Sequence, residues 1–287
     1  MAKTNTNSTI INKRTYKTRL LLGTVLLASA STLIGCSSQA SNTEKKDDST
    51  DMAHIRIAAA ANLADVLPKI IDEYHQAQVT ADTLGTDIEV TYASSGKLYA
   101  QIGAGAPYDI FLSANQDFPQ KLAATHHGKI PFSYARGQLA IYSVTQPLGA
   151  PDAQTLSKIR STSLPLKLTL ANSTLAPYGA AAEQYLQAAL SAPLPSNVRT
   201  IQAENIGQTF QYVHSGSVDY GFVALSQLIA TDTPKSQYTV LPSSAYPAIL
   251  QDGIVLSDDP AAQGFARYLQ SAEAQRVLER SGYIHAP

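Results

Sequence analysis

The chain has 287 residues, one cysteine, no tryptophan and a formal net charge of −1. Residues 1–35 hold five of the 21 Lys and Arg and none of the 22 Asp and Glu, which leaves 16 basic against 22 acidic side chains, a net charge of −6, for residues 36–287. A chain this acidic is a poor candidate for nucleic-acid binding, which uses basic stripes, and one cysteine allows no internal disulfide. Any anion that it binds must therefore be held by local donors and dipoles.

The N-terminus has the pattern of a bacterial lipoprotein leader. Basic residues without acidic ones precede the apolar run Leu20–Leu33, which is shorter than a membrane-spanning helix needs. The run ends in LIGC, which resembles a lipobox, so we expect residues 1–35 to be a signal peptide and Cys36 to carry the lipid. Residues 36–53 are mostly polar and lack aromatic side chains, which predicts a flexible tether. We then expect the protein in the cell envelope, lipid-anchored on the periplasmic side.

The stretch His54–Asp65 is predicted to join a buried strand to a helix. Asn62 stands where a helix N-cap is expected, with Asp65 at capping-box spacing. Apolar residues follow at helical spacing over 63–74, and Pro68 inside this pattern predicts a kink or one unpaired carbonyl group. Free N–H groups at such a junction can bind an anion, and an ordinary strand–helix turn is the alternative interpretation.

Strands and helices alternate along the rest of the chain. Strands are predicted at 87–95, 108–112, 138–144, 166–170, 198–203, 218–224 and 247–256, and helices at 96–103, 115–124, 180–190 and 206–214, with two more at the C-terminus. This alternation predicts an α/β fold of parallel sheets with crossover helices. We predict two lobes, residues 54–135 with 248–287 and residues 136–247, with crossings near 134–137 and 246–253.

The sequence holds no motif that assembles an enzyme. A P-loop, GxGxxG, HExxH and a nucleophile elbow are all missing, and the six histidines lack acidic partners at ligand spacing. His126 and His127 are interpreted as a solvated turn, because adjacent side chains do not share a face. Asp109 and Asp219 are interpreted as structural hydrogen-bond anchors. We therefore expect neither an enzyme nor a cofactor.

Small or neutral polar residues recur at helix starts that follow strands: Asn62, Ser95, Tyr178 and the pair Asn205-Ile206. Each of them is unremarkable alone, because helix caps are common. Together they lie on the carboxyl side of the predicted strands, where ligands of open α/β sheets bind. The sequence therefore indicates an anion site built from hydroxyl groups and helix N–H groups.

Four segments carry a resemblance to a known family: IRIAAAANLADVLPKI, VTYASSGKLYAQIGAGAPYDIFLSAN, LANSTLAPYGAAAEQYL and AENIGQTFQYVHSGSVDYGFVALSQ. They resemble the substrate-binding proteins of molybdate ABC importers over nearly the whole predicted folded part. The resemblance implies a two-lobed periplasmic-binding-protein fold, with a mainly parallel sheet in each lobe and molybdate or tungstate in the cleft between the lobes. It also implies a permease and its ATPase as partners of a monomeric receptor.

By motif match, the resemblance puts the oxyanion ligands on Ala61, Asn62, Ser95, Tyr178 and, through its backbone N–H, Ile206. Some family members carry a tyrosine where Ala224 stands here, and we expect Tyr178 to replace that hydroxyl from another loop. Molybdate is a dianion that only accepts hydrogen bonds, so neutral donors without a carboxylate suit it. A receptor for sulfate or another small oxyanion stays open as an alternative, and so does an envelope hydrolase.

Overall fold

The computed structural model describes residues 52–81, 85–125, 129–146, 148, 152–190 and 193–286. The predicted signal peptide, Cys36, most of the tether and the pair His126-His127 lie outside these residues. Residues 49–287 belong to one compact unit. Among the helices that the structure describes, none combines the length and the apolar character that crossing a membrane requires.

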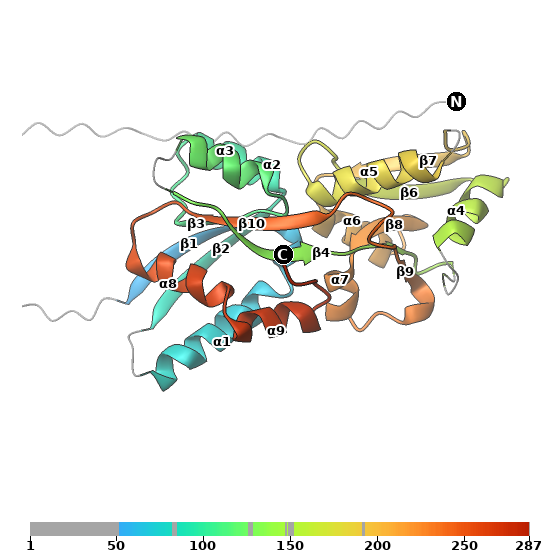
Figure 1. The fold of residues 1–287 in the computed structure, drawn as a ribbon. Coiled ribbons are helices and arrows are strands. Elements are labelled where there is room, and N and C mark those ends of the chain that lie inside the picture. The colour runs from blue at the N-terminus through green and yellow to red at the C-terminus, as the bar shows by residue number, and fades with distance from the viewer. Residues whose placement is uncertain are drawn as a thin grey trace, which may run out of the picture. The chain divides into compact units, whose positions relative to one another are not determined.

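Two five-stranded sheets form the framework of this unit (Figure 1). The first has the order β2-β1-β3-β10-β4, from β1 (Ala53–Ala60), β2 (Thr86–Ala93), β3 (Ile110–Leu112), β4 (Phe132–Gly137) and β10 (Ile249–Val255). The second has the order β7-β6-β8-β5-β9, from β5 (Leu139–Tyr142), β6 (Leu166–Ala171), β7 (Val198–Ala203), β8 (Tyr220–Ala224) and β9 (Tyr238–Val240). In each sheet the first three strands of the order are parallel to one another. The fourth strand, β10 or β5, runs antiparallel to both of its neighbours, so both sheets are mixed.

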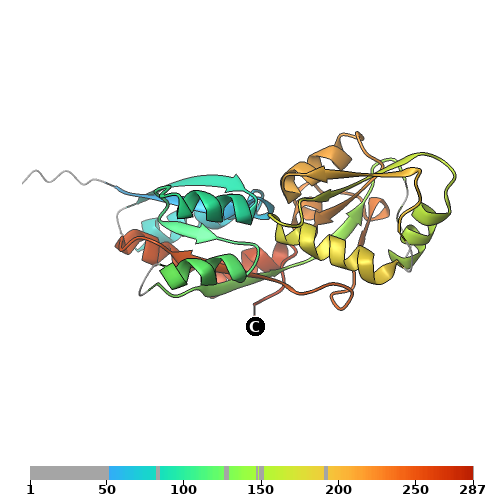
Figure 2. The same ribbon diagram turned by 90° about the horizontal axis from the view of Figure 1, so that it is seen from above.

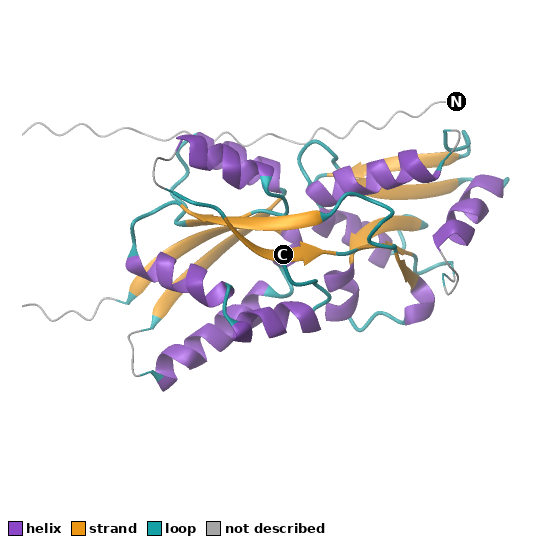
Figure 3. Cartoon of the chain, in the orientation of Figure 1, coloured by secondary structure: helices purple, strands orange, loops and turns teal. Residues whose placement is uncertain are grey.

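Helices flank both sheets, and Figures 2 and 3 show them around the strands. Around the first sheet lie α1 (Leu67–Thr80), α2 (Ser95–Gly103), α3 (Asp117–Thr125), α8 (Pro260–Leu269) and α9 (Ala272–Arg280). The second sheet is accompanied by α4 (Asp152–Ser161), α5 (Pro177–Ala189), α6 (Ile206–His214) and α7 (Leu225–Ala230), and two short 3₁₀ turns are η1 (Ala61–Leu63) and η2 (Lys235–Gln237). We call the first sheet with its helices lobe one and the second sheet with its helices lobe two. The predicted two-lobed α/β fold is confirmed.

The second half of β1, Ile57–Ala60, is apolar without alternation because it is buried on both faces. Ile57 lies in the core cluster that packs against α1, α8 and α9, whereas the next residue, Ala58, lies in the cluster formed with α2 and α3. Successive side chains of a strand point to opposite faces, and here both faces are covered. A strand buried on both sides loses the alternation of polar and apolar residues.

The start of α1 differs from the sequence prediction. The chain makes the 3₁₀ turn η1 directly after β1, and α1 begins only at Leu67, with no side-chain cap. Pro68 therefore lies in the first turn of the helix, where proline is tolerated, and the predicted kink was wrong. Asn62 was expected to cap this helix, but its side chain bonds elsewhere, as described below.

The chain crosses between the two sheets twice, and the crossings are neighbours. It passes from β4 to β5 between Gly137 and Leu139, and it returns from β9 to β10 between Val240 and Ile249. Gly137 is paired with Ile249 in the antiparallel ladder of β4 and β10, which run side by side in Figure 1. The predicted lobe limits at 135/136 and 247/248 stay predictions, and β1 begins at Ala53, the last residue of the predicted tether.

Candidate functional site

A small cavity lies where strands of both sheets end. It has about 200 Å³ of space free of protein atoms, part of it open to solvent, and is lined by Ala60, Ala61, Asn62, Ala93, Ser94, Ser95, Ala114, Ala176, Pro177, Tyr178, Asn205 and Ile206. The carboxyl ends of β1 and β2 lead into it from lobe one, at Ala60 and Ala93. All five residues that the resemblance marks as ligands line this one cavity, although they come from distant parts of the chain. None of these twelve residues carries a charged side chain.

Helices begin at the cavity, and their first N–H groups have no partner within the helix. In α5 the first residue is Pro177, which has no N–H, so Tyr178 carries the first donor of that helix. In α6 the Asn205 side chain caps the helix by accepting from Gln208 N over 2.9 Å, as the sequence predicted. Because the Asn205 side chain bonds the N–H of Gln208, it does not occupy the N–H of Ile206, the first residue of α6, which lines the cavity.

The lobes touch each other beside the cavity. The N–H of Gly96 in α2 donates to the carbonyl oxygen of Leu175 in lobe two over 2.8 Å. Lys97 Nζ lies 2.6 Å from Glu204 Oε1, and this ion pair is about half exposed. These contacts join lobe one to lobe two on the α2 side, so the cavity lies between them.

Two serines from the SSG sequence offer hydroxyl groups. Ser95 Oγ accepts a hydrogen bond from the N–H of Ala114 over 2.9 Å, so its own hydrogen is free to donate. Ser94 is also buried, and its Oγ has no hydrogen-bond partner among the described residues. The sequence predicted Ser94 only as part of the strand 87–95. The signal that could have found it is the pairing of two serines at one strand–helix junction.

The Asn62 side chain points its donors away from any ligand. Its Nδ2 donates to Gln251 Oε1 over 2.9 Å and to Tyr283 Oη over 3.0 Å, which uses both hydrogens. Tyr283 Oη in turn donates to the carbonyl oxygen of Asn62 over 2.7 Å. The side chain therefore fixes the η1 turn, and the groups of Asn62 and Ala61 that remain for an anion are backbone N–H groups.

The Tyr178 hydroxyl is also engaged. It accepts from Gln251 Nε2 over 3.3 Å, and it lies so close to Gly137 that a Cβ on that residue would overlap it. Burial raises the pKa of Tyr178 well above its ordinary value of 10, so the hydroxyl is neutral. The hydroxyl accepts in that bond and keeps its own hydrogen, so its expected role as the donor missing at Ala224 stays a prediction. Gln251 is not among the residues that the sequence marked.

The other polar candidates have structural roles. Asp109 Oδ2 accepts from the N–H of Arg56, and Asp219 Oδ2 accepts from the N–H of Lys167, each over 2.8 Å. Both aspartates are hydrogen-bond anchors at strand starts, as predicted. Among the described residues, no group of His, Cys, Asp and Glu side chains could hold a metal ion.

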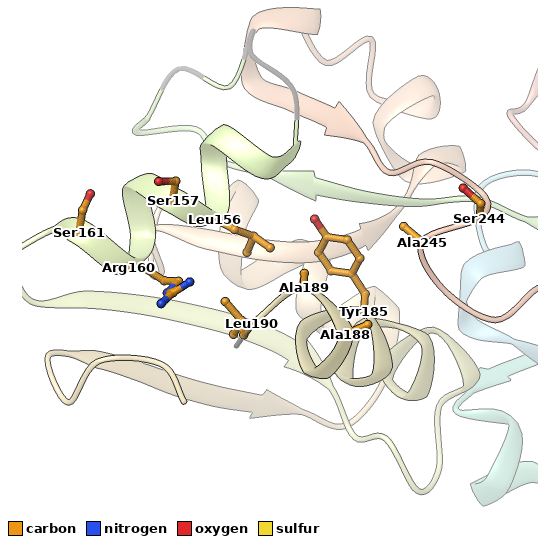
Figure 4. Close-up of a pocket in the computed structure, with 10 residues that line it drawn as sticks. All are labelled: Leu156, Ser157, Arg160, Ser161, Tyr185, Ala188, Ala189, Leu190, Ser244 and Ala245. Carbon is orange, nitrogen blue, oxygen red and sulfur yellow. The ribbon is translucent and has the colours of Figure 1, made fainter. Parts of the chain in front are cut away.

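A larger cavity, with about 1390 Å³ of space free of protein atoms, lies in lobe two, and Figure 4 shows the residues that line it. Its walls include Ser157, Arg160 and Ser161 of α4 and Ala188 and Ala189 of α5. These residues lie toward the carboxyl ends of their helices, where the helix dipole disfavours an anion. None of the predicted ligands lines this cavity, so the smaller one is the better candidate site.

Comparison with known proteins gives a consistent set of relatives. A family model for bacterial extracellular solute-binding proteins matches residues 55–284. The molybdate-binding protein ModA of Azotobacter vinelandii is 32% identical over 270 residues, 91% of this chain and 97% of that protein. The putative ABC transporter substrate-binding lipoprotein YvgL of Bacillus subtilis (strain 168) is 28% identical over 251 residues, 87% of this chain and 92% of that protein.

Solved structures agree on the fold. The periplasmic molybdate-binding protein of Azotobacter vinelandii matches with a TM-score of 0.71 at 25% identity, over 81% of this chain and all of that one. The sulfate-binding protein SubI of Mycobacterium tuberculosis matches with a TM-score of 0.63 at 13% identity, over 81% of this chain and 87% of that one. The second match shows a shared fold and carries no statement about the ligand.

Proposed function

We propose that this chain, which belongs to the bacterial extracellular solute-binding proteins and within them to the ModA-type proteins, binds molybdate outside the cytoplasmic membrane. In this proposal it delivers the anion to the permease of an ABC importer and is not an enzyme. The observation that carries the proposal is the composition of the small cavity, where five expected ligands meet without a charged side chain.

The donors suit a dianion that carries no proton. The N–H groups of Tyr178 and Ile206, those at the start of η1, and the hydroxyl groups of Ser95 and Ser94 can all donate. Hydrogen bonds from such donors to a charged acceptor are short and strong, and helix N-termini favour negative charge. Phosphate keeps a proton near neutral pH and would need an acceptor; the twelve lining residues include no carboxylate, and the only unpaired side-chain oxygen that is purely an acceptor among them is the neutral amide oxygen Asn62 Oδ1.

Tungstate shares the tetrahedral shape and the charge of molybdate, so the proposal includes it as a second ligand. Sulfate is also a fully deprotonated tetrahedral dianion, and it differs from molybdate in size. Selectivity for molybdate over sulfate would therefore have to come from the size of the cavity. A sulfate receptor is the competing function, because sulfate would present the same charge and shape to the same neutral donors.

Binding is proposed to close the two lobes. A ligand shifts a conformational equilibrium only through different contacts in the two states, and the cavity takes donors from both lobes. The crossings at 137–139 and 240–249 would absorb the rotation, since hinges are a few residues at element ends. The permease would then recognise the closed arrangement. A lipid on Cys36 would hold the receptor at the membrane, and a relative named as a lipoprotein supports this part.

Calorimetry of the mature chain with molybdate, tungstate, sulfate and phosphate tests the function. We expect saturable binding of molybdate and tungstate, and displacement of neither by excess sulfate. Small-angle scattering should show a smaller radius of gyration with molybdate and no change with phosphate. Sulfate that binds tighter than molybdate would replace the proposal with the competing one, and turnover of generic esters or phosphoesters would favour a hydrolase.

A further inference from the structure

We propose that Gln251 is a positioning residue of the oxyanion site, one whose single amide group ties the Asn62 turn of lobe one to the Tyr178 helix start of lobe two. The inference rests on the proposed function, because it concerns the same cavity. It goes beyond that function by naming a residue that touches no ligand and still sets the affinity.

Gln251 lies in β10, is 0% exposed and has partners on both sides. Its Oε1 accepts from Asn62 Nδ2 over 2.9 Å and lies 3.1 Å from Tyr134 Oη. Its Nε2 donates to Tyr178 Oη over 3.3 Å. Asn62 and Tyr178 both line the small cavity, so this one side chain connects the two walls of the site behind the ligand position.

Two backbone features lie next to the Gln251 side chain: a shift in strand register and a glycine on the partner strand. The pairing of β10 with β4 shifts register between Gln251 and Asp252, because β4 has one extra residue there, Tyr134, whose hydroxyl group bonds Gln251 Oε1. Such β-bulges occur next to functional sites, where they change the direction of a side chain. On the partner strand, a Cβ at Gly137 would overlap Tyr178 Oη and lie 2.7 Å from Gln251 Nε2. The glycine therefore leaves the space in which the two polar groups meet.

The two bonds of the amide should respond differently to opening of the lobes. Asn62 and Gln251 both belong to lobe one, so their bond persists in any rigid-body rotation. Tyr178 belongs to lobe two, so opening would separate its hydroxyl from Gln251 Nε2 and leave buried polar groups to find new partners. A buried donor without a partner is unfavourable, and the bond therefore adds to the stability of the closed state.

Gln251→Met tests the inference, because it keeps the approximate shape of the side chain and removes both polar atoms. We expect the dissociation constant for molybdate, measured by calorimetry on the mature chain, to rise about 5- to 150-fold, the usual range for coupling between two parts of a protein. Scattering at a molybdate concentration that saturates the wild type should show a larger radius of gyration for the variant.

Gln275→Met is the matched control. Gln275 is also a buried glutamine of lobe one, and its Nε2 donates to the carbonyl oxygens of Tyr134 and Leu269, both over 3.0 Å. It does not line the cavity, so its loss should lower the melting temperature and leave the dissociation constant unchanged. If Gln251→Met caused only a general loss of stability, both variants would have lower melting temperatures and both would keep the wild-type affinity for molybdate.

Tyr178→Phe provides a second route, which is needed if Gln251→Met does not fold. It removes only the acceptor of Gln251 Nε2 and should also raise the dissociation constant. In the double variant the two effects should be smaller than their sum, because both changes break one bond. Additive effects, or an unchanged dissociation constant in Gln251→Met, would overturn the inference. Absence of molybdate binding by the wild type would instead overturn the proposed function.

Discussion

The backbone N–H of Gly96 in lobe one donates to the carbonyl oxygen of Leu175 in lobe two over 2.8 Å, beside the small cavity. Two main chains from different lobes approach each other here without an intervening side chain. A Cβ at position 96 would lie 3.0 Å from the Cα of Leu175. The closed arrangement of the lobes therefore depends on the smallest residue at this position.

Gly96→Ala is expected to weaken molybdate binding by about 1–3 kcal/mol, the cost of an added methyl group in a packed contact. The backbone of Leu175 would have to move for the lobes to close. Gly103→Ala, at the other end of the same helix, is the control, because no atom lies within 4 Å of the added Cβ. Titration calorimetry of both variants checks this, and equal affinities would show that the contact does not govern closure.

Ser95→Ala removes a hydroxyl hydrogen that is free to donate at the cavity. We expect molybdate binding to weaken by about 1–3 kcal/mol, the range for a hydrogen bond to a charged group. Ser143→Ala is a suitable comparison, because Ser143 is buried and accepts from backbone N–H groups in lobe two, away from the cavity. If calorimetry finds that both variants bind as the wild type does, Ser95 is not a ligand.

Ser94→Ala should separate binding from stability. The Ser94 hydroxyl is buried without a partner among the described residues, so its removal should leave the free energy of unfolding unchanged or slightly higher. Binding of molybdate should nevertheless weaken by about 1–3 kcal/mol if this hydroxyl donates to the anion. Urea unfolding and calorimetry on the same variant measure the two quantities. Unchanged affinity would remove Ser94 from the donor set.

The buried tyrosines behind the cavity predict a loss of stability at high pH. Burial raises the pKa of Tyr283 to about 12 from its ordinary value of 10, so folding favours the neutral hydroxyl. This contribution is fully present below pH 10 and is lost as the pH rises toward 12, which amounts to about 2–3 kcal/mol. Urea unfolding between pH 8 and pH 12 should show the fall, and Tyr283→Phe should make it smaller. An identical pH dependence in the variant would contradict the assignment.

Cys36→Ser tests the predicted anchor. Cys36 is the only thiol in the chain, so its loss should leave an uncleaved precursor or a soluble protein. Detergent phase partitioning of the wild type and the variant measures this directly. A variant that still partitions into the detergent phase would rule out lipidation at this residue.

The sequence predicted elements well where the signals are local. The helix Ile206–His214 has its predicted bounds, because Asn205 caps it through a residue only three positions away. The start of α1 was predicted wrongly, because the Asn62 amide bonds Gln251 and Tyr283, which are 189 and 221 residues away. Those partners compete with the helix for the same side chain, and no local pattern reveals them.

The candidate site was predictable in part for the same reason. Ser95, Tyr178 and Ile206 stand at helix starts that the local sequence marks, and they do line one cavity. Gln251 could not be found in this way, because its partners Asn62, Tyr134 and Tyr178 are 73 to 189 residues away in the sequence. The elements α4, α7, β4 and β9 were also missed: α7 and β9 are short, and the sequences of α4 and β4 contain more polar residues than the patterns that indicate a helix or strand.

The pairing of Gly137 with Ile249 joins the two crossings at their lobe-one ends, where the hydrogen-bonded ribbon of β4 and β10 begins. Such a ribbon twists and bends, but sliding one strand along the other would break its ladder. In the closure that we propose, the ladder would restrict the lobes to nearly one rotation, which would be the same for every bound anion. A permease that recognises only this rotation cannot distinguish one bound anion from another. Discrimination between anions must then be complete before the receptor meets its transporter, in the few donors that line the cavity.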